Sequence, residues 1–69
     1  MRLIKLKEVL NLTALSRASV YRLMNDGKFP VSVSLGERSV GWVEEEVLNW
    51  IEERIAARDD DLKTSKAAA

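Results

Sequence analysis

The chain has 69 residues, a formal net charge of zero, and neither cysteine nor histidine. A chain of this length forms one domain at most, with a small hydrophobic core. The lack of cysteine excludes disulfides and thiolate metal sites, and the lack of histidine removes the usual general base and zinc-binding nitrogen. We therefore expect no enzyme, no metal and no cofactor, and we expect association to help stabilise so small a core.

The hydropathy pattern argues against a membrane protein. No apolar run approaches the ~18 residues that a membrane span needs. The first ten residues interleave charged with apolar side chains, unlike the continuous apolar segment of a signal peptide. The sequence favours a soluble, cytoplasmic protein with no membrane partner.

Charge is distributed unevenly along the chain. Residues 1–43 hold seven Lys or Arg and three Asp or Glu, whereas residues 44–69 hold four and eight. The two parts therefore carry net charges of +4 and −4. Such asymmetry indicates a nucleic-acid-facing half, although small soluble domains can also carry uneven charge without that function.

Two short helices are expected in the first 25 residues. Leu6, Val9 and Leu10 have the spacing of one helical face and predict a helix over residues 6–12. A second helix over residues 17–25 buries a stripe that we expect to consist of Val20, Leu23 and Met24.

The ends of the second helix carry clear local signals. Ser16 is a good N-cap, because its hydroxyl can accept a hydrogen bond from a free N–H of the first turn. Gly27 suits the C-terminal cap, and Pro30 prevents the helix from continuing.

A two-stranded hairpin is expected next. Alternating or β-branched residues predict strands over residues 31–34 and 38–40, joined by a turn at residues 35–37. A hairpin of this size must pack on other elements to be stable. The side chains expected to do so are Phe29, Val31, Val33, Val40 and Trp42.

A third helix is predicted over residues 43–57. Glu44, Glu45 and Glu46 lie in its first turn, where the helix dipole favours negative charge. Its apolar face comprises Val43, Val47, Trp50, Ile51 and Ile55. The polar residues that follow indicate a folded domain over residues 1–58 and a flexible tail over residues 59–69.

The fold class that this order of elements predicts is α+β and mainly helical. It is a winged helix-turn-helix, with three helices and a two-stranded wing between the second and third. In such a fold the second helix enters the major groove of DNA while the first crosses behind it.

The exposed face of the second helix and the hairpin carry the candidate DNA contacts. Arginine can fork onto guanine or phosphate, asparagine can pair with adenine, and hydroxyls bind phosphate oxygens. The candidates are Ser16, Arg17, Ser19, Tyr21, Arg22, Asn25, Lys28, Arg38 and Ser39.

Four of these candidates also have a plainer interpretation. Arg22 can be a solvated charge, Arg17 can pair with a carboxylate, and Tyr21 can pack under the wing. Asn25 can simply serve the helix end. Trp42 and Trp50 are expected in the core, and three adjacent glutamates fan around a helix without forming an acid–base site.

A family resemblance rests on several short motifs. They are Arg2-Leu3, Leu6-Lys7-Glu8-Val9, the run Leu15-Ser16-Arg17-Ala18-Ser19-Val20-Tyr21-Arg22-Leu23-Met24, Gly27-Lys28-Phe29-Pro30, Trp42-Val43-Glu44, Val47 and Trp50. Over roughly residues 2–56 the chain resembles the AlpA family of prophage transcriptional regulators, small relatives of excisionase and MerR-type winged helix domains. It departs from the family's usual pattern at Ala14, where glycine is common in the turn, and at Ser32, where a second proline is common.

The resemblance implies a protein that binds DNA near phage or genomic-island genes and often activates an integrase or excision gene. We expect a sequence-specific transcriptional regulator that binds double-stranded DNA as a homodimer or cooperative array on the nucleoid. We expect RNA polymerase or a recombinase as its protein partner. Two alternatives stay open: an excisionase-like DNA-bending factor and a protein-interaction module that uses the acidic third helix.

Overall fold

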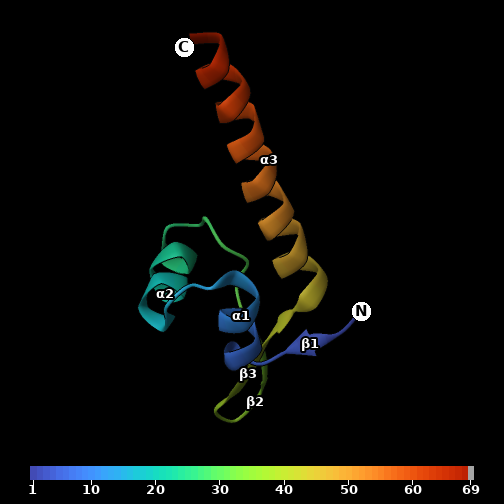
Figure 1. The fold of residues 1–69 in the computed structure, drawn as a ribbon. Helices are drawn as coiled ribbons and strands as arrows, with labels where there is room; N and C mark the ends of the chain where they lie inside the picture. Colours follow the sequence, from blue (N-terminus) through green and yellow to red (C-terminus); the bar gives the residue numbers. More distant parts are fainter. Residues whose placement is uncertain (69) are drawn as a thin grey trace.

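The computed structural model describes the backbone of residues 1–68 and the side chains of residues 1–61 (Figure 1). Three helices and three strands follow one another along the chain. They are β1 (Leu3–Ile4), α1 (Leu6–Thr13), α2 (Arg17–Asn25), β2 (Val33–Gly36), β3 (Ser39–Val43) and α3 (Glu44–Ala68). The β2–β3 hairpin between α2 and α3 confirms the predicted winged helix-turn-helix.

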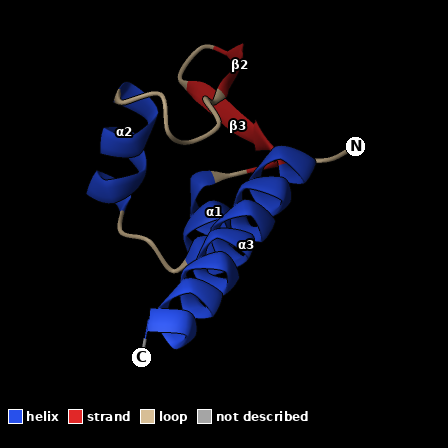
Figure 2. Cartoon of the chain, turned by 90° about the horizontal axis from the view of Figure 1, so that it is seen from above, coloured by secondary structure: helices blue, strands red, loops and turns tan. Residues whose placement is uncertain are grey.

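The helices are arranged so that α1 lies between α2 and α3 (Figures 1 and 2). One side of α2 therefore packs toward the body of the domain and the opposite side is left open. The wing projects away from the free end of α3 (Figure 1).

The sheet has one strand more than predicted. Its order is β1-β3-β2, and β1 pairs antiparallel with the end of β3 through Leu3 and Val43. Beside this pair, the Glu44 N–H donates to the Arg2 carbonyl at 2.7 Å, and the Arg2 guanidinium lies 3.1 Å from the Glu44 carboxylate. The N-terminal residues are thereby fastened to the start of α3.

Helix α2 has the bounds predicted from its capping residues. The Ser16 hydroxyl accepts a hydrogen bond from the Ser19 N–H at 3.2 Å. At the other end, Gly27 has a φ of +70°, and the Lys28 N–H donates to the Leu23 carbonyl at 2.8 Å. This is a Schellman motif, in which a left-handed residue ends the helix.

The turn between α1 and α2 requires a left-handed residue. Helix α1 ends at Thr13, one residue later than predicted, and Ala14 follows with a φ of +60°. Its N–H donates to the Leu10 carbonyl at 2.8 Å. An L-residue with a side chain adopts this conformation at a cost that glycine avoids.

We therefore expect Ala14→Gly to raise the free energy of unfolding by about 1 kcal/mol. Urea denaturation followed by circular dichroism measures the change. The matched control is Ala18→Gly, at an exposed position inside α2, which should lose about 1 kcal/mol. A loss of stability in both variants would contradict the assigned turn.

The core is formed by Ile4, Val9, Val20, Phe29, Trp42 and Val47. Leu6, Leu10, Leu15, Leu23, Met24, Trp50 and Ile51 pack against it. The Trp42 ring is fully buried, and its indole N–H donates to the Pro30 carbonyl at 3.2 Å. The prediction that Trp42 belongs to the core is confirmed, whereas Trp50 is half-buried and packs against the core.

The predicted packing of the wing is confirmed for Phe29 and Trp42 and wrong for the three valines. Val31 is 62% exposed, and Val33 and Val40 are also exposed. The strands are displaced as well, since β2 begins at Val33 and β3 continues to Val43. The physical reason is that the hairpin extends beyond the helices, so only the end of β3 that holds Trp42 reaches the core.

Helix α3 is longer than predicted. It continues to Ala68 instead of ending near residue 57, and neither glycine nor proline interrupts residues 44–68. Ile55, expected on its buried face, is 44% exposed, and the C-terminal part of α3 extends beyond the rest of the domain (Figure 1). A domain boundary at residue 58 and a flexible tail over residues 59–69 stay predictions, since the side chains beyond residue 61 lie outside the described part.

In the described part of the chain, no helix combines the length and apolar character needed to cross a membrane.

Candidate nucleic-acid interface

The outer face of α2 presents polar and basic groups to solvent. Arg17, Tyr21, Arg22 and Asn25 are exposed, while Val20 on the opposite face is fully buried. This follows from the helical period, which places residues one turn apart on the same side. Two guanidinium groups, a phenol and an amide thus lie on one helix face.

Arg17 and Tyr21 interact across one turn of this face. The guanidinium carbon of Arg17 lies 5.9 Å from the centre of the Tyr21 ring, within the range of a cation–π contact. Tyr21 is 37% exposed, so it lies on the surface and is not packed under the wing. The ring restricts Arg17 without neutralising its charge.

Ser16 and Ser19 form a small hydroxyl pair at the start of α2. The Ser16 hydroxyl accepts from the Ser19 N–H and lies 2.9 Å from the Ser19 hydroxyl. Ser16 is therefore already engaged as the N-cap. The Ser19 side chain is half-buried beside it.

Ser16→Ala should lower the free energy of unfolding by about 1 kcal/mol, because it removes this cap. Thermal unfolding followed by circular dichroism tests the expectation. Ser34→Ala, on the exposed strand β2, is the control and should change stability little. Equal unfolding temperatures for the two variants would mean that the cap contributes nothing.

The wing ends in a tight turn that displays Arg38. Gly36 pairs with Ser39, so Glu37 and Arg38 form the turn, with an irregularity in the strand pairing beside it. Arg38 is exposed at the tip with a φ of +56°. The predicted turn at residues 35–37 is thus displaced by one to two residues.

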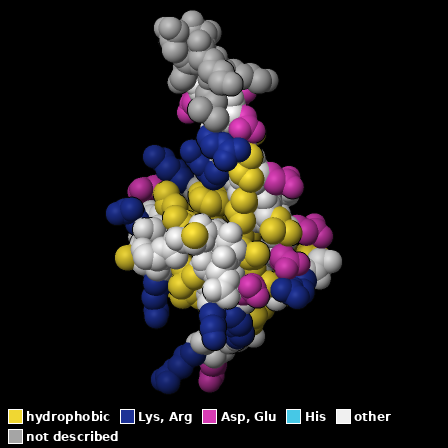
Figure 3. Space-filling model, in the orientation of Figure 1, with side chains coloured by type: hydrophobic (Ala, Val, Ile, Leu, Met, Phe, Trp, Pro, Cys, Tyr) yellow, Lys and Arg dark blue, Asp and Glu magenta, His cyan; other side chains and the backbone are white. Residues whose placement is uncertain are grey.

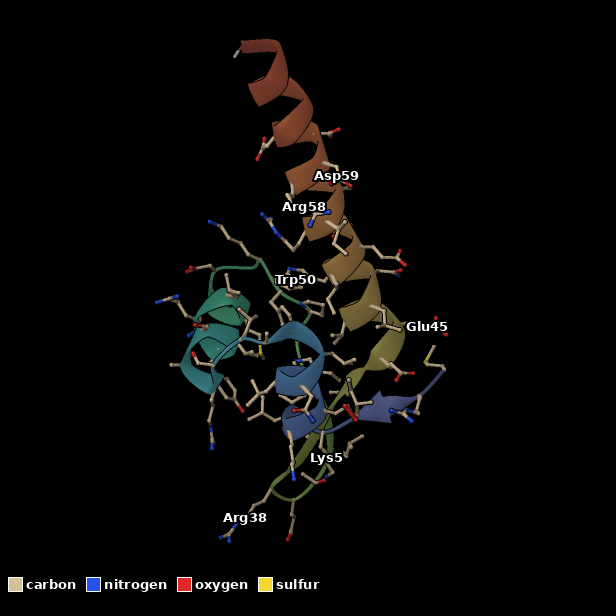
Figure 4. The ribbon with its side chains drawn as sticks, in the orientation of Figure 1. Lys5, Arg38, Glu45, Trp50, Arg58 and Asp59 are labelled. Carbon is tan, nitrogen blue, oxygen red and sulfur yellow. The ribbon has the colours of Figure 1, made fainter. Side chains whose placement is uncertain are left out.

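Lys5 supports the wing from the body of the domain, a role that the sequence did not reveal. Its ammonium donates to the Ser39 hydroxyl at 3.1 Å, across 34 positions of sequence (Figure 4). Ser39 is half-buried and already accepts this hydrogen bond. Its hydroxyl hydrogen and one acceptor lone pair are left for another partner.

Lys28 lies just beyond α2 with an exposed side chain. Its carbonyl accepts a 2.7 Å hydrogen bond from the indole N–H of Trp50. The Trp50 ring also meets Phe29 edge to face, with the ring centres 4.8 Å apart. These contacts fix the loop that follows α2 onto α3.

Ion pairing divides the cations into two groups. Arg2 and Arg58 pair with carboxylates, at 3.1 and 3.0 Å. Within the described residues, Arg17, Arg22, Lys28 and Arg38 form no such pair. The cationic side chains of α2 and the wing are therefore not engaged in ion pairs.

The structure gathers some candidate residues and separates others. Arg17, Ser19, Tyr21, Arg22 and Asn25 all belong to α2, while Arg38 and Ser39 lie apart on the wing. Figure 4 shows Arg38 at the end of the wing farthest from α3. Among the residues whose side chains are described, no three acidic, His or Cys side chains gather as a metal site would require.

The three helices and the β2–β3 wing define a winged helix-turn-helix protein. The family model described as prophage CP4-57 regulatory protein (AlpA) matches residues 2–55. This chain belongs to the AlpA family of prophage regulatory proteins.

Two relatives are similar over most of the chain. One is "Uncharacterized protein ORF88" of Enterobacteria phage P4, 44% identical over 57 residues, which cover 83% of this chain and 65% of that protein. Another is "DNA-binding transcriptional activator AlpA" of Escherichia coli (strain K12), 36% identical over 59 residues, which cover 77% of this chain and 84% of that protein. The match therefore spans just under two thirds of the phage P4 protein.

Proposed function

We propose that this protein is a sequence-specific, DNA-binding transcriptional regulator of prophage or mobile-element genes, such as an integrase or excision gene. The observation that carries the proposal is the exposed basic and polar face of α2 together with the exposed Arg38 on the wing. Membership of the AlpA family supports it, as does the relative whose name describes a DNA-binding transcriptional activator.

In this proposal α2 lies in the major groove. A helix with its side chains is about 10–12 Å wide and the groove is about 12 Å wide, so the two fit. Arg22 and Asn25 would contact base edges, while Arg17, Ser19 and Tyr21 would contact phosphates. The Arg17–Tyr21 contact supports this assignment, because it holds a guanidinium in place before DNA binds.

The wing would contact the adjacent backbone or minor groove through Arg38. The backbone of Arg38 has a left-handed conformation, which glycine adopts more easily than other residues. Strain of this kind is often retained where a side chain has a function. Lys28, beside α2, and Ser39, beside Arg38, would add contacts with the DNA backbone.

A single module of this size covers little DNA, about 600–1,000 Å² of protein surface. Useful affinity therefore calls for two copies, as a homodimer or as a cooperative array on repeated sites. A footprint that shows two protected half-sites would fix their order and spacing, and one half-site would mean a monomer.

The direct test is an electrophoretic shift on the DNA flanking the gene of this protein. Arg22→Ala/Arg38→Ala should abolish the specific complex, because the double variant loses two of the proposed contacts with DNA. The control Arg54→Ala/Arg58→Ala removes the same charge from α3, where Arg58 lies far from Arg38 (Figure 4), and should retain binding. Equal losses in the two variants, or no wild-type shift at low salt, would refute the proposal.

Two parallel assays distinguish a transcriptional regulator from a DNA-bending factor. A reporter fused to the bound region should change its expression when the protein is supplied. Excision of the mobile element without a change in reporter expression would favour the DNA-bending role. The protein partner would then be a recombinase in place of RNA polymerase.

A further inference from the structure

An apolar groove lies between the C-terminal end of α1 and the middle of α3. Leu12 lines it from α1, and Trp50, Ile51 and Ile55 line it from α3. Leu12 and Ile55 are 38% and 44% exposed. Figure 3 shows apolar side chains along this part of α3 with Lys and Arg side chains beside them.

Two arginines form the rim of this groove. Arg54 and Arg58 both line it, and they are four residues apart, which places their side chains on neighbouring turns of one helix face. Within the described residues Arg54 has no ion-pair partner, and Arg58 pairs only with the adjacent Asp59 at 3.0 Å. That pair is exposed on both sides, so an incoming carboxylate can replace it at little cost.

We infer that this groove binds an acidic amphipathic helix of a partner protein. An amphipathic helix buries its apolar face in a groove through residues at i, i+3, i+4 and i+7. Leu12, Trp50 and Ile55 offer the apolar surface for that stripe. Two carboxylates four residues apart on the partner match the spacing of Arg54 and Arg58 and can form bidentate hydrogen bonds with them.

The position of the groove separates it from the proposed DNA contact of the wing. Arg58 lies partway along α3, far from Arg38 at the tip of the wing (Figure 4). A protein bound at Arg58 therefore leaves the wing free. The inference does not rest on DNA binding, and it can fail or hold independently of it.

Charge also argues against a second copy of this chain as the occupant. On α3, Arg54 and Arg58 lie on the same flank of Ile55, at 100° per residue. An antiparallel two-fold pairing through Ile55 makes identical flanks of the two copies meet. The arginines of both copies would then face one another, and such like-charge contacts are unfavourable.

The test uses three synthetic helical peptides of about 20 residues, a length at which isolated helices begin to be stable. The first peptide carries leucines at positions i, i+3, i+4 and i+7 and glutamates on both sides of this leucine stripe. The second replaces every glutamate with lysine, and the third replaces every leucine with glutamine. Binding is measured by fluorescence anisotropy of the labelled peptides with the full chain.

We expect saturable binding of the acidic amphipathic peptide and binding at least about tenfold weaker for the other two. Arg54→Glu/Arg58→Glu should reverse the preference toward the lysine peptide. Ile55→Gln should weaken the acidic peptide about tenfold, whereas Leu48→Gln should not. Leu48 is a matched control, since it is 41% exposed on the same helix and does not line the groove.

Three results would overturn the inference. The first is equal affinity for the acidic and lysine peptides, and the second is no saturable binding of the acidic peptide. The third is self-association in sedimentation that Ile55→Gln abolishes and Leu48→Gln does not, which places a second copy in the groove. Circular dichroism verifies that each variant is folded, and unchanged DNA shifts show that the proposed DNA surface is intact.

Discussion

Trp42→Ala is expected to leave most of the protein unfolded in neutral buffer at room temperature. Trp42 has the largest fully buried side chain of the described residues, and its indole N–H donates to the Pro30 carbonyl. Truncating a buried tryptophan to alanine costs about 3–5 kcal/mol. At about 0.05–0.15 kcal/mol per residue, a chain of this length has only roughly 3–10 kcal/mol of stability.

Circular dichroism and the dispersion of amide signals in NMR spectra measure this loss. Trp50→Ala is the comparison, because Trp50 is only half-buried and should be less costly to remove. Trp42→Phe retains most of the apolar volume and removes the indole hydrogen bond, so it should remain folded with reduced stability. A Trp42→Ala protein that unfolds at the wild-type temperature would contradict this account of the core.

The predictability of each element depends on how local its determinants are. Helix α2 was predicted with its correct bounds because Ser16 and Gly27, which cap it, lie beside it in the sequence. Strand β1 was missed because its two residues carry no recognisable pattern. Its existence depends on pairing with β3, some forty positions away.

The same distinction applies to the candidate site. The helical period alone places Arg17, Tyr21 and Arg22 on an open face, and the structure has them exposed there. The internal hydrogen bond between Lys5 and Ser39 depends on a distant contact, and no spacing in the sequence signals it. The exposure of Val33 and Val40 was missed for a related reason, since alternation shows a strand without showing which neighbours cover it.

The groove beside Ile55 shows how tertiary structure creates a surface that periodicity conceals. The spacing of Ile55 with Val47 and Ile51 predicts a buried position. Burial requires a neighbouring element, and α1 covers only the lower part of this stripe, where Leu12 meets α3. Ile55 is only partly covered and remains exposed to solvent.

Arg22→Ala and Arg38→Ala are expected to weaken DNA binding in different ways. If Arg22 contacts a base edge, its loss should cost about 1–3 kcal/mol, which is roughly 5–150-fold in affinity, and relax the preference at one base pair. If Arg38 contacts phosphate, its loss should weaken all sequences alike. It should also lower the slope of log affinity against log salt by about one.

Competition shifts with single-base variants of the site, repeated over a salt series, separate the two effects. Lys7→Ala is the control, since Lys7 is exposed on α1 and is not one of the proposed contacts, so its loss should change affinity only slightly. Arg22→Ala that weakens every sequence equally would assign Arg22 to the backbone and leave Asn25 as the remaining base-reading candidate on α2. Arg38→Ala that changes base preference would instead mean that the wing, and not α2 alone, determines the sequence that is bound.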